Sequence, residues 1–292
     1  MVDTTQTEGA ARSTVLPTKR RRLPRVREAI GVILPIVVCF IVVIGIWEAI
    51  VKLANPASYI LPQPLDVFRA IKSSLATNPG TSGSFGYNLG VTLEETVIGF
   101  CFGSVIGLVV AGLMVEIRVI ERAVLPYVFG LQSMPKVAIA PLLIVWFGYG
   151  IESRALMAFL LALFPMLVNS FYGLSAMSAE QSELMASIGA SRFQAFRFVR
   201  LPGAFPFVFA GLDLGIVYAF LGAVVAELIG GTQGVGVLVV QAQGTNDTTE
   251  VFAVLILLAI AGWLLHAIVN SARRRVVFWE PVAVRRRALA RQ

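Results

Sequence analysis

Apolar residues gather into six long runs that are separated by polar stretches. Each run approaches or exceeds the roughly 20 residues that a helix needs to cross about 30 Å of hydrocarbon. The pattern predicts an all-α, polytopic membrane protein with about six transmembrane helices. We place these helices at residues 30–50, 89–114, 123–147, 154–176, 205–229 and 250–271.

Three connections between the runs are long enough to carry structure of their own. The first, residues 55–87, is rich in Pro, Gly and Ser, and residues 65–75 within it have the spacing of a short amphipathic helix on the membrane surface. The Gly-rich residues 230–249 join the last two runs, and the glycines at positions 230, 231, 234 and 236 predict a turn. Residues 177–203 are polar but show helix-like spacing. Because this segment is too polar to enter the bilayer, its surface is available to a soluble partner.

Composition supports the membrane assignment. Charged residues make up only 14% of the chain, against roughly 25% in soluble domains, and the mean hydropathy is +0.80. The net charge of +7 does not indicate nucleic-acid binding, because most of it flanks apolar runs, where basic residues set topology and contact anionic lipids. We divide the chain into a basic tail at residues 1–28, a transmembrane domain at residues 29–280 and a second basic tail at residues 281–292.

The distribution of Lys and Arg predicts the orientation. With the N-terminus in the cytoplasm, six spans return the C-terminus to the same side. Nineteen of the 24 basic residues then lie on the cytoplasmic side, and only Lys52, Arg69, Lys72 and Arg154 lie outside. This asymmetry satisfies the positive-inside rule. We therefore expect a multi-pass protein of the cell (inner) membrane with both termini and residues 177–203 in the cytoplasm.

Two predicted spans carry a small residue at every fourth position. Such a series lines one face of a helix and lets another backbone approach closely. It indicates packing between helices or between subunits, unless it reflects chance in a chain rich in Gly and Ala. The residues are Gly99, Gly103, Gly107 and Ala111 in the second span, and Gly211, Gly215, Ala219 and Ala223 in the fifth.

The segment AEQSELMASIGASRFQAFRFVRLP, residues 179–202, predicts two short helices joined by a turn. Residues 183–188 suit the first helix, and Gly189 can supply the turn at its end. Ser191 can cap the second helix, whose arginines face water or lipid headgroups. We expect Pro202 to end that helix before the fifth span begins.

This segment resembles the loop motif of ABC importer permeases, which reads E-A-A, three residues, G, nine residues, I-x-L-P. The chain keeps the spacing at Glu183, Gly189 and Leu201–Pro202. It departs from the motif at Leu184 and Met185, which replace the two alanines and make the first helix bulkier. The similarity extends over roughly residues 58–280, to the nitrate, sulfonate and taurine importer branch, through LQSMPKVAIAPLLIVWFGYG (131–150), GASRFQAFRFVRLPGAFPFVFAGLDLG (189–215), VVAELIG (224–230) and GVGVL (234–238).

The resemblance implies a type I ABC importer permease fold and a set of partners. These are a cytoplasmic ABC ATPase subunit, expected in two copies, an extracytoplasmic substrate-binding protein, and a second permease copy, expected to form a homodimer. It also implies a small anionic solute of the nitrate, sulfonate or taurine kind. The first helix of the loop would dock on the ATPase, and the implied coupling residues are Glu183, Leu184, Met185, Ala186, Gly189, Ala190, Leu201 and Pro202.

Catalytic chemistry is not expected in this chain. It has no G-x-x-x-x-G-K-[ST] phosphate loop, so we expect ATP hydrolysis on a separate subunit. Cys39, Cys101 and the one histidine, His266, are dispersed, which argues against a zinc site or a disulfide framework. We therefore expect no catalytic residue, no metal site and no cofactor.

Ionisable residues inside spans are costly and are functional candidates by default. Lys136 follows Pro135 in the third predicted span, and Asp213 lies in the fifth. These two side chains either pair inside the helix bundle or take part in the solute pathway, where a lysine would favour an anion. The alternative function is a secondary transporter driven by an ion gradient, but it would need internal repeats that we do not find. Four carboxylates are expected at the outer membrane interface: Glu48, Glu94, Glu95 and Glu227.

Overall fold

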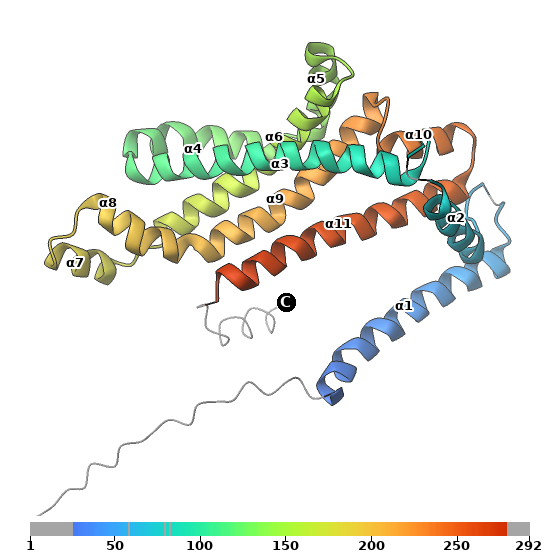
Figure 1. Cartoon of the computed structure of the whole chain (residues 1–292), viewed down its shortest axis with the longest axis horizontal. Coiled ribbons are helices and arrows are strands. Elements are labelled where there is room, and N and C mark those ends of the chain that lie inside the picture. Colours follow the sequence, from blue (N-terminus) through green and yellow to red (C-terminus); the bar gives the residue numbers. More distant parts are fainter. Residues whose placement is uncertain (1–25, 58, 79, 82, 279–292) are drawn as a thin grey trace, which may run out of the picture. The chain divides into compact units, whose positions relative to one another are not determined.

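The structure is a computed structural model, and it describes residues 26–278 except residues 58, 79 and 82. All regular elements of these residues are helices (Figure 1). The two basic tails that the sequence analysis proposed lie almost entirely outside the described residues. The α-helices are α1 (Val26–Ala54), α2 (Pro64–Ala76), α3 (Phe85–Glu116), α4 (Arg118–Ser133), α5 (Ala140–Phe147), α6 (Ile151–Ser175), α7 (Ala179–Ser187), α8 (Arg192–Ala195), α9 (Leu201–Gly230), α10 (Val235–Gly244) and α11 (Thr248–Val276).

Helix α1 forms a unit by itself, and the chain from Asn55 onward forms a second unit. From Val37 to Ala54 the helix is strongly apolar, yet most of these side chains are exposed. A helix that is apolar on all faces must be covered by lipid or by other protein. This property is expected of a transmembrane helix.

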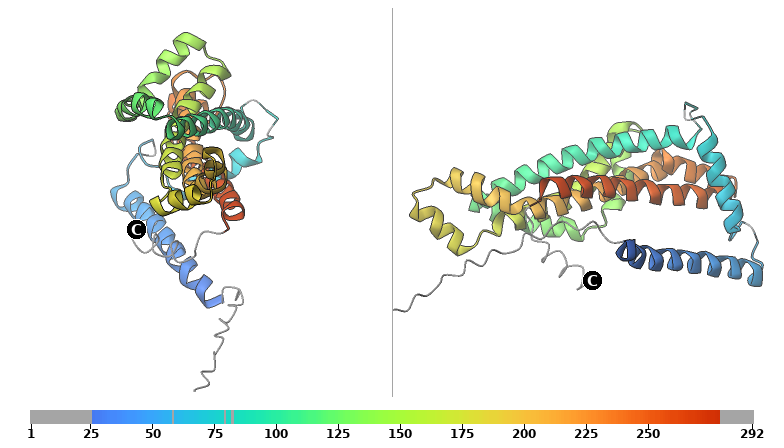
Figure 2. Two further views of the ribbon diagram at one scale, coloured as in Figure 1. Left: turned by 90° about the vertical axis from the view of Figure 1, so that its left-hand side faces the viewer. Right: turned by 60° about the horizontal axis from the view of Figure 1, so that its bottom comes forward.

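The second unit is built around three long helices, α3, α6 and α9, with α6 packed against both others (Figure 2). Helix α11 packs along α9, and α2 packs against α11. The small residues predicted to line helix faces lie in these contacts. A Cβ atom added at Gly99 would lie 2.6 Å from the Ala155 carbonyl oxygen of α6, and one added at Gly211 would lie 3.2 Å from the Met166 Cα atom. The two small-residue faces therefore pack between helices of the same chain.

Five of the described helices are long and apolar enough to cross a membrane, or six if one bent pair is counted as a single span. The bent pair is the predicted third span, residues 123–147, which is not one continuous helix. Helix α4 ends at Ser133, a short 3₁₀ segment η1 (Lys136–Ile139) follows, and α5 continues at 90° to α4. Met134 has an extended backbone because it precedes Pro135, and the residue before a proline is disfavoured in a helix. The proline therefore breaks the span instead of kinking it.

Pro202 behaves in the opposite way, and the prediction that it ends a helix is wrong. Residues 192–230 form one helical span of 39 residues that passes through Pro202. A π-helical segment, η2 (Phe196–Arg200), lies directly before the proline, and the Leu201 N–H bonds to the Phe196 carbonyl five residues earlier. Since proline lacks an N–H, this local widening lets the helix continue without the missing bond.

Two connections also hold helices. Helix α2 confirms the short helix predicted at residues 65–75; its position on the membrane surface stays a prediction. The Gly-rich connection at residues 230–249 contains a further ten-residue helix, α10, because residues 235–242 are apolar enough to pack against α9 and α11. The sequence analysis missed this helix since the glycines around it favour a turn.

Candidate functional site

Helices α7 and α8 form a short helical hairpin, residues 178–195, whose ends are fixed by side-chain caps. Ser178 accepts a hydrogen bond from the Gln181 N–H, and the Gln181 side chain accepts one from the Ser178 N–H, which completes a capping box. Ser191 and Gln194 repeat this arrangement at the start of α8. The predicted cap at Ser191 is confirmed. These caps let two very short helices exist with little support from packing.

Gly189 makes the turn between the two helices. Its φ is +68°, in the left-handed region that favours glycine. The Gly189 N–H bonds to the Ala186 carbonyl, and the Ala190 N–H bonds to the Met185 carbonyl. This pair of bonds is a Schellman motif, which satisfies the last free carbonyls of α7. The turn predicted at Gly189 is therefore present.

The α7–α8 hairpin is exposed on most of its surface. No residue of α7 is buried, and the helix begins at Ala179, four residues earlier than predicted. Three large apolar side chains point away from the bundle: Leu184, Ile188 and Phe193 are 62%, 67% and 68% exposed. Exposed apolar side chains grouped on a polar segment are typical of a protein-binding surface.

The base of the hairpin is tied to the bundle by Arg200. Its Nη1 atom lies 3.1 Å from the Glu116 carboxylate at the end of α3, and its Nε donates to the Met177 sulfur. Next to Met177, the Ser178 hydroxyl lowers the pKa of the exposed Glu180 carboxyl by hydrogen bonding to it. A carboxylate in the first turn also interacts favourably with the helix dipole of α7.

The structure brings most of the predicted coupling residues together. Six of them lie on the hairpin, at Glu183, Leu184, Met185, Ala186, Gly189 and Ala190. Leu201 and Pro202 instead lie at the start of α9, at the foot of the hairpin. The hairpin thus continues directly into a spanning helix through η2, so that a movement of α7 can reach α9.

Lys136 and Asp213 are not paired with each other. Lys136 Nζ lies 5.0 Å from the centre of the Phe164 ring and donates to the Gln132 carbonyl oxygen. Asp213 instead lies 2.6 Å from Nδ1 of His266 on α11. The pair of Asp213 and His266 was not predicted, although one lies near the start of the predicted fifth span and the other near the end of the sixth, which places both at one level.

Lys136 lines an open cavity of about 440 Å³. The wall is mostly apolar and comes from η1, α6 and α9, with amide groups supplied by Gln132 and Asn169. The Asn169 side chain donates to the Pro165 carbonyl. An ammonium group at the edge of an apolar cavity can bind an anion that carries an apolar part.

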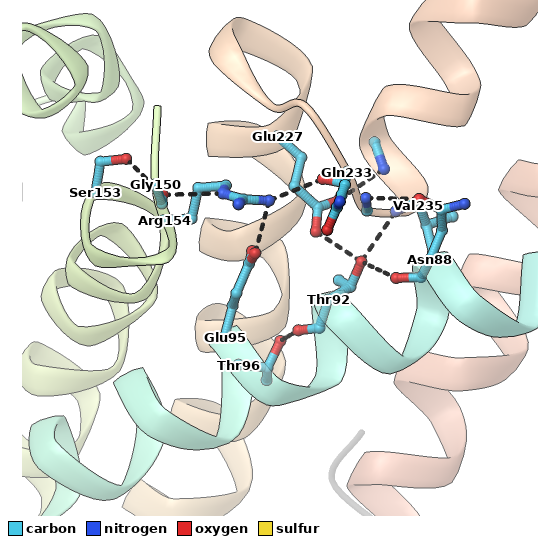
Figure 3. A network of polar contacts seen from close by, with 12 residues as sticks. Asn88, Thr92, Glu95, Thr96, Gly150, Ser153, Arg154, Glu227, Gln233 and Val235 are labelled. Atoms are coloured by element: carbon cyan, nitrogen blue, oxygen red, sulfur yellow. Dashed lines mark hydrogen bonds and ion pairs between the residues drawn. The ribbon is translucent and has the colours of Figure 1, made fainter. Parts of the chain in front are cut away.

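A buried polar cluster joins α3, α6, α9 and the α9–α10 turn (Figure 3). Arg154 lies at its centre, with Nη1 at 2.7 Å from Glu95 Oε1 and at 2.8 Å from the Gln233 carbonyl oxygen. Its Nε donates to the Gly150 carbonyl oxygen. Arg154 is 5% exposed, and Glu95 is fully buried. The guanidinium thus links three segments that are far apart in the sequence.

The second carboxylate of the cluster is Glu227, which is 1% exposed. Its oxygens accept hydrogen bonds from the Thr92 hydroxyl and from the Gly236 N–H. Asn88 accepts a further bond from the N–H of Gly234, whose φ is +113°. The α9–α10 turn is therefore held against α3 by buried side chains.

The prediction that Glu95 and Glu227 are exposed at the interface is wrong, and Arg154 was not considered as their partner. One signal was present in the sequence. Glu95, Arg154 and Glu227 all lie near the predicted outer ends of their spans, so the alternating direction of the helices places them at one level. An arginine and two glutamates at the same depth indicate a buried ion cluster.

Comparison with known proteins identifies the family. Residues 103–278 match the family described as binding-protein-dependent transport system inner membrane component. A riboflavin transport system permease protein of Chloroflexus aurantiacus is 33% identical, over 88% of this chain and 95% of that protein. A putative aliphatic sulfonates transport permease protein of Bacillus subtilis is 30% identical, over 85% and 87%. A solved structure of the MetNI methionine ABC transporter in an inward-facing conformation shares the fold, with a TM-score of 0.56 at 23% identity, over 65% of this chain and 94% of that one.

In this family the permease and the ATPase are separate subunits, in agreement with the lack of a phosphate loop in the sequence. The chain is therefore not an enzyme in its own right. It belongs to the family of binding-protein-dependent transport system inner membrane components, as an ABC importer permease of the branch that includes the sulfonate permeases, with a type I importer permease fold.

Proposed function

We propose that this chain forms the path by which an ATP-driven importer moves a small anionic solute into the cell, with the α7–α8 hairpin as the contact to the ATPase. The observation that carries this proposal is the exposure of the hairpin. Its caps and its Schellman turn give α7 a fixed shape although none of its residues is buried. A helix that is ordered, exposed and apolar at Leu184 and Ile188 fits a groove of a soluble subunit.

The hairpin also has the mechanical connection that coupling requires. Phe193 and the rest of α8 run without a break through η2 into α9, which lies against α6 for much of its length. A displacement of α7 by the ATPase would therefore act on the core of the bundle as a rigid-body movement. Two ATPase subunits on two permease copies would move the two bundles relative to each other.

The orientation is part of the proposal. The excess of Lys and Arg places the hairpin and both termini in the cytoplasm of a cell-membrane protein. The Arg154 cluster and the α9–α10 turn would then face the opposite side, where a substrate-binding protein delivers the solute. In this arrangement the ATPase acts at one end of the bundle, and the solute enters at the other end.

The surroundings of Lys136 support the proposal that the solute is an anion. No carboxylate of the described residues forms an ion pair with it, and its Nζ atom lies over the Phe164 ring in an open cavity. A cation without a counter-ion at membrane depth is costly, and a passing anion would relieve that cost. The relatives are named for solutes as different as riboflavin and aliphatic sulfonates. Their names therefore do not define one solute class, and the choice of an anion rests on Lys136.

The coupling role is tested by a matched pair of substitutions at Gly189. A Cβ atom at this position would meet no atom within 4 Å, so a substitution here changes the backbone energy without causing a steric clash. Gly189→Val places a β-branched residue at φ +68°, at a cost of about 1–2 kcal/mol, which lowers the equilibrium constant for forming the turn about tenfold. Gly189→Asn keeps the turn, because asparagine tolerates the left-handed region.

We expect the Val variant to insert normally but to lose up to about tenfold in ATP hydrolysis by the reconstituted transporter, because the turn forms less readily. The Asn variant should retain most of the activity. The measurement is ATP hydrolysis in lipid vesicles together with the amount of ATPase subunit that co-purifies. Equal activity of the two variants would remove the hairpin from the coupling mechanism.

The anion role is tested by Lys136→Met beside Lys136→Arg, which keeps the charge. Transport of small anions such as taurine, alkanesulfonates and nitrate into vesicles is measured for both variants. Loss of the charge should lower transport of the accepted anion about tenfold, as expected when a buried charge–charge hydrogen bond is removed. The Lys136→Arg variant should retain a substantial part of the wild-type transport. If Met and Arg act alike, the charge of Lys136 has no role in passage.

A further inference from the structure

A second cavity, of about 580 Å³, lies beneath the α7–α8 hairpin, between the hairpin and the corner where α3 meets α4. Its charged lining is unbalanced, because three guanidinium groups face one carboxylate. The carboxylate, Glu116, is already paired with Arg200. The other two guanidinium groups belong to Arg118 on α4 and Arg192 on α8.

Arg118 and Arg192 form no ion pair with any carboxylate of the described residues. They come from different elements and line the same cavity, together with the Ser182 hydroxyl. A further carboxylate, Glu121, lines a neighbouring hollow that also contains Ser182 and Arg200. Two unpaired guanidinium groups and a hydroxyl around one space are the donors that bind a phosphate group.

The ATPase is an unfavourable candidate for the occupant. Ser182, Met185 and Ala186 line the cavity, and their spacing of three and four residues places them on one face of α7. Leu184 and Ile188, the exposed apolar residues that we assign to the ATPase, lie on the other face. The cavity therefore lies between α7 and the bundle, behind the proposed docking surface.

The depth of the cavity fits the headgroup layer. Helix α3 is long and apolar enough to cross a membrane, and it ends at Glu116, which lines the cavity. A spanning helix ends where the hydrocarbon gives way to phosphates. In the orientation that we propose, this layer belongs to the cytoplasmic leaflet, which is rich in anionic lipid.

We propose that the space beneath the α7–α8 hairpin binds a phosphate group, supplied by a phospholipid headgroup of the cytoplasmic leaflet, through Arg118 and Arg192. The bound phosphate links α4 to α8 and steadies the hairpin from behind. This inference rests on the proposed orientation, but it concerns a ligand that the transport proposal does not require.

The test uses the full-length chain purified in detergent, without the ATPase or the binding protein. Phosphatidylglycerol is titrated, and the lipid retained is counted by native mass spectrometry; inorganic phosphate is the second probe, titrated alone and as a competitor. The Arg118→Gln/Arg192→Gln variant is compared with Arg197→Gln, which removes an exposed arginine of η2 outside the cavity. Melting temperatures check that all variants are folded.

We expect the double variant to bind phosphatidylglycerol about tenfold more weakly, since charge-assisted hydrogen bonds are lost, while Arg197→Gln binds as the wild type does. Arginine-dependent binding of inorganic phosphate without lipid binding would support the phosphate site and assign it a soluble ligand. Equal lipid binding by the two variants would overturn the proposal. Because no step measures transport, failure here leaves the proposed function standing.

Discussion

Substitution of Arg154 by methionine is expected to destabilise the bundle by about 3–5 kcal/mol, because it leaves buried carboxylates without their counter-ion. Arg154 lies 2.7 Å from Glu95 and also holds the Gln233 carbonyl oxygen, so one substitution removes both contacts. Methionine has a similar length and fills the space, which separates loss of charge from loss of volume. Thermal unfolding in detergent should show a melting temperature lower by about 10 °C.

Two further variants test whether loss of the Arg154 charge causes the lower melting temperature. Arg154→Met/Glu95→Gln removes one of the uncompensated carboxylates and should regain part of the loss, because a neutral amide costs less to bury than a charge. Arg197→Met removes an exposed arginine and should melt as the wild type does. If Arg154→Met melts at the wild-type temperature, the cluster does not hold the α9–α10 turn in place.

The sequence predicted the hairpin better than it predicted the ion cluster, for a physical reason. Gly189 and Ser191 act on their own neighbours, so their turn and cap can be inferred from a few consecutive residues. The cluster joins Glu95, Arg154 and Glu227 from three helices. Its burial depends on how those helices pack, and hydrophobic runs give their lengths but not their contacts.

The two prolines also show that tertiary packing cannot be inferred from a few consecutive residues. Pro135 breaks a span and Pro202 lies inside one, although each follows a large apolar residue. The π-helical segment before Pro202 absorbs the missing hydrogen bond, whereas the extended Met134 before Pro135 ends α4. A proline in a sequence marks a point where helical bonding must change. Tertiary packing decides between a break and a local widening.

Replacing Gly99 by alanine should destabilise the protein even though alanine is the better helix former. The new Cβ would lie 2.5 Å from the Ala158 Cβ and 2.6 Å from the Ala155 carbonyl oxygen and the Phe159 nitrogen. Two of these atoms belong to the backbone of α6, so the helices themselves must separate. Overpacking of this kind costs about 1–3 kcal/mol, more than the gain of about 1 kcal/mol in helix propensity.

Gly112 provides the matched control, because it lies in the same helix and an added Cβ would meet nothing within 4 Å. Gly112→Ala should therefore keep or slightly raise the melting temperature, while Gly99→Ala lowers it by several degrees. Opposite signs for one chemical change in one helix would establish that close packing of α3 on α6 holds the bundle together. A higher melting temperature in both variants would mean that α6 can shift away from α3 at little cost. A displacement of the hairpin would then deform the bundle instead of moving it as a rigid body.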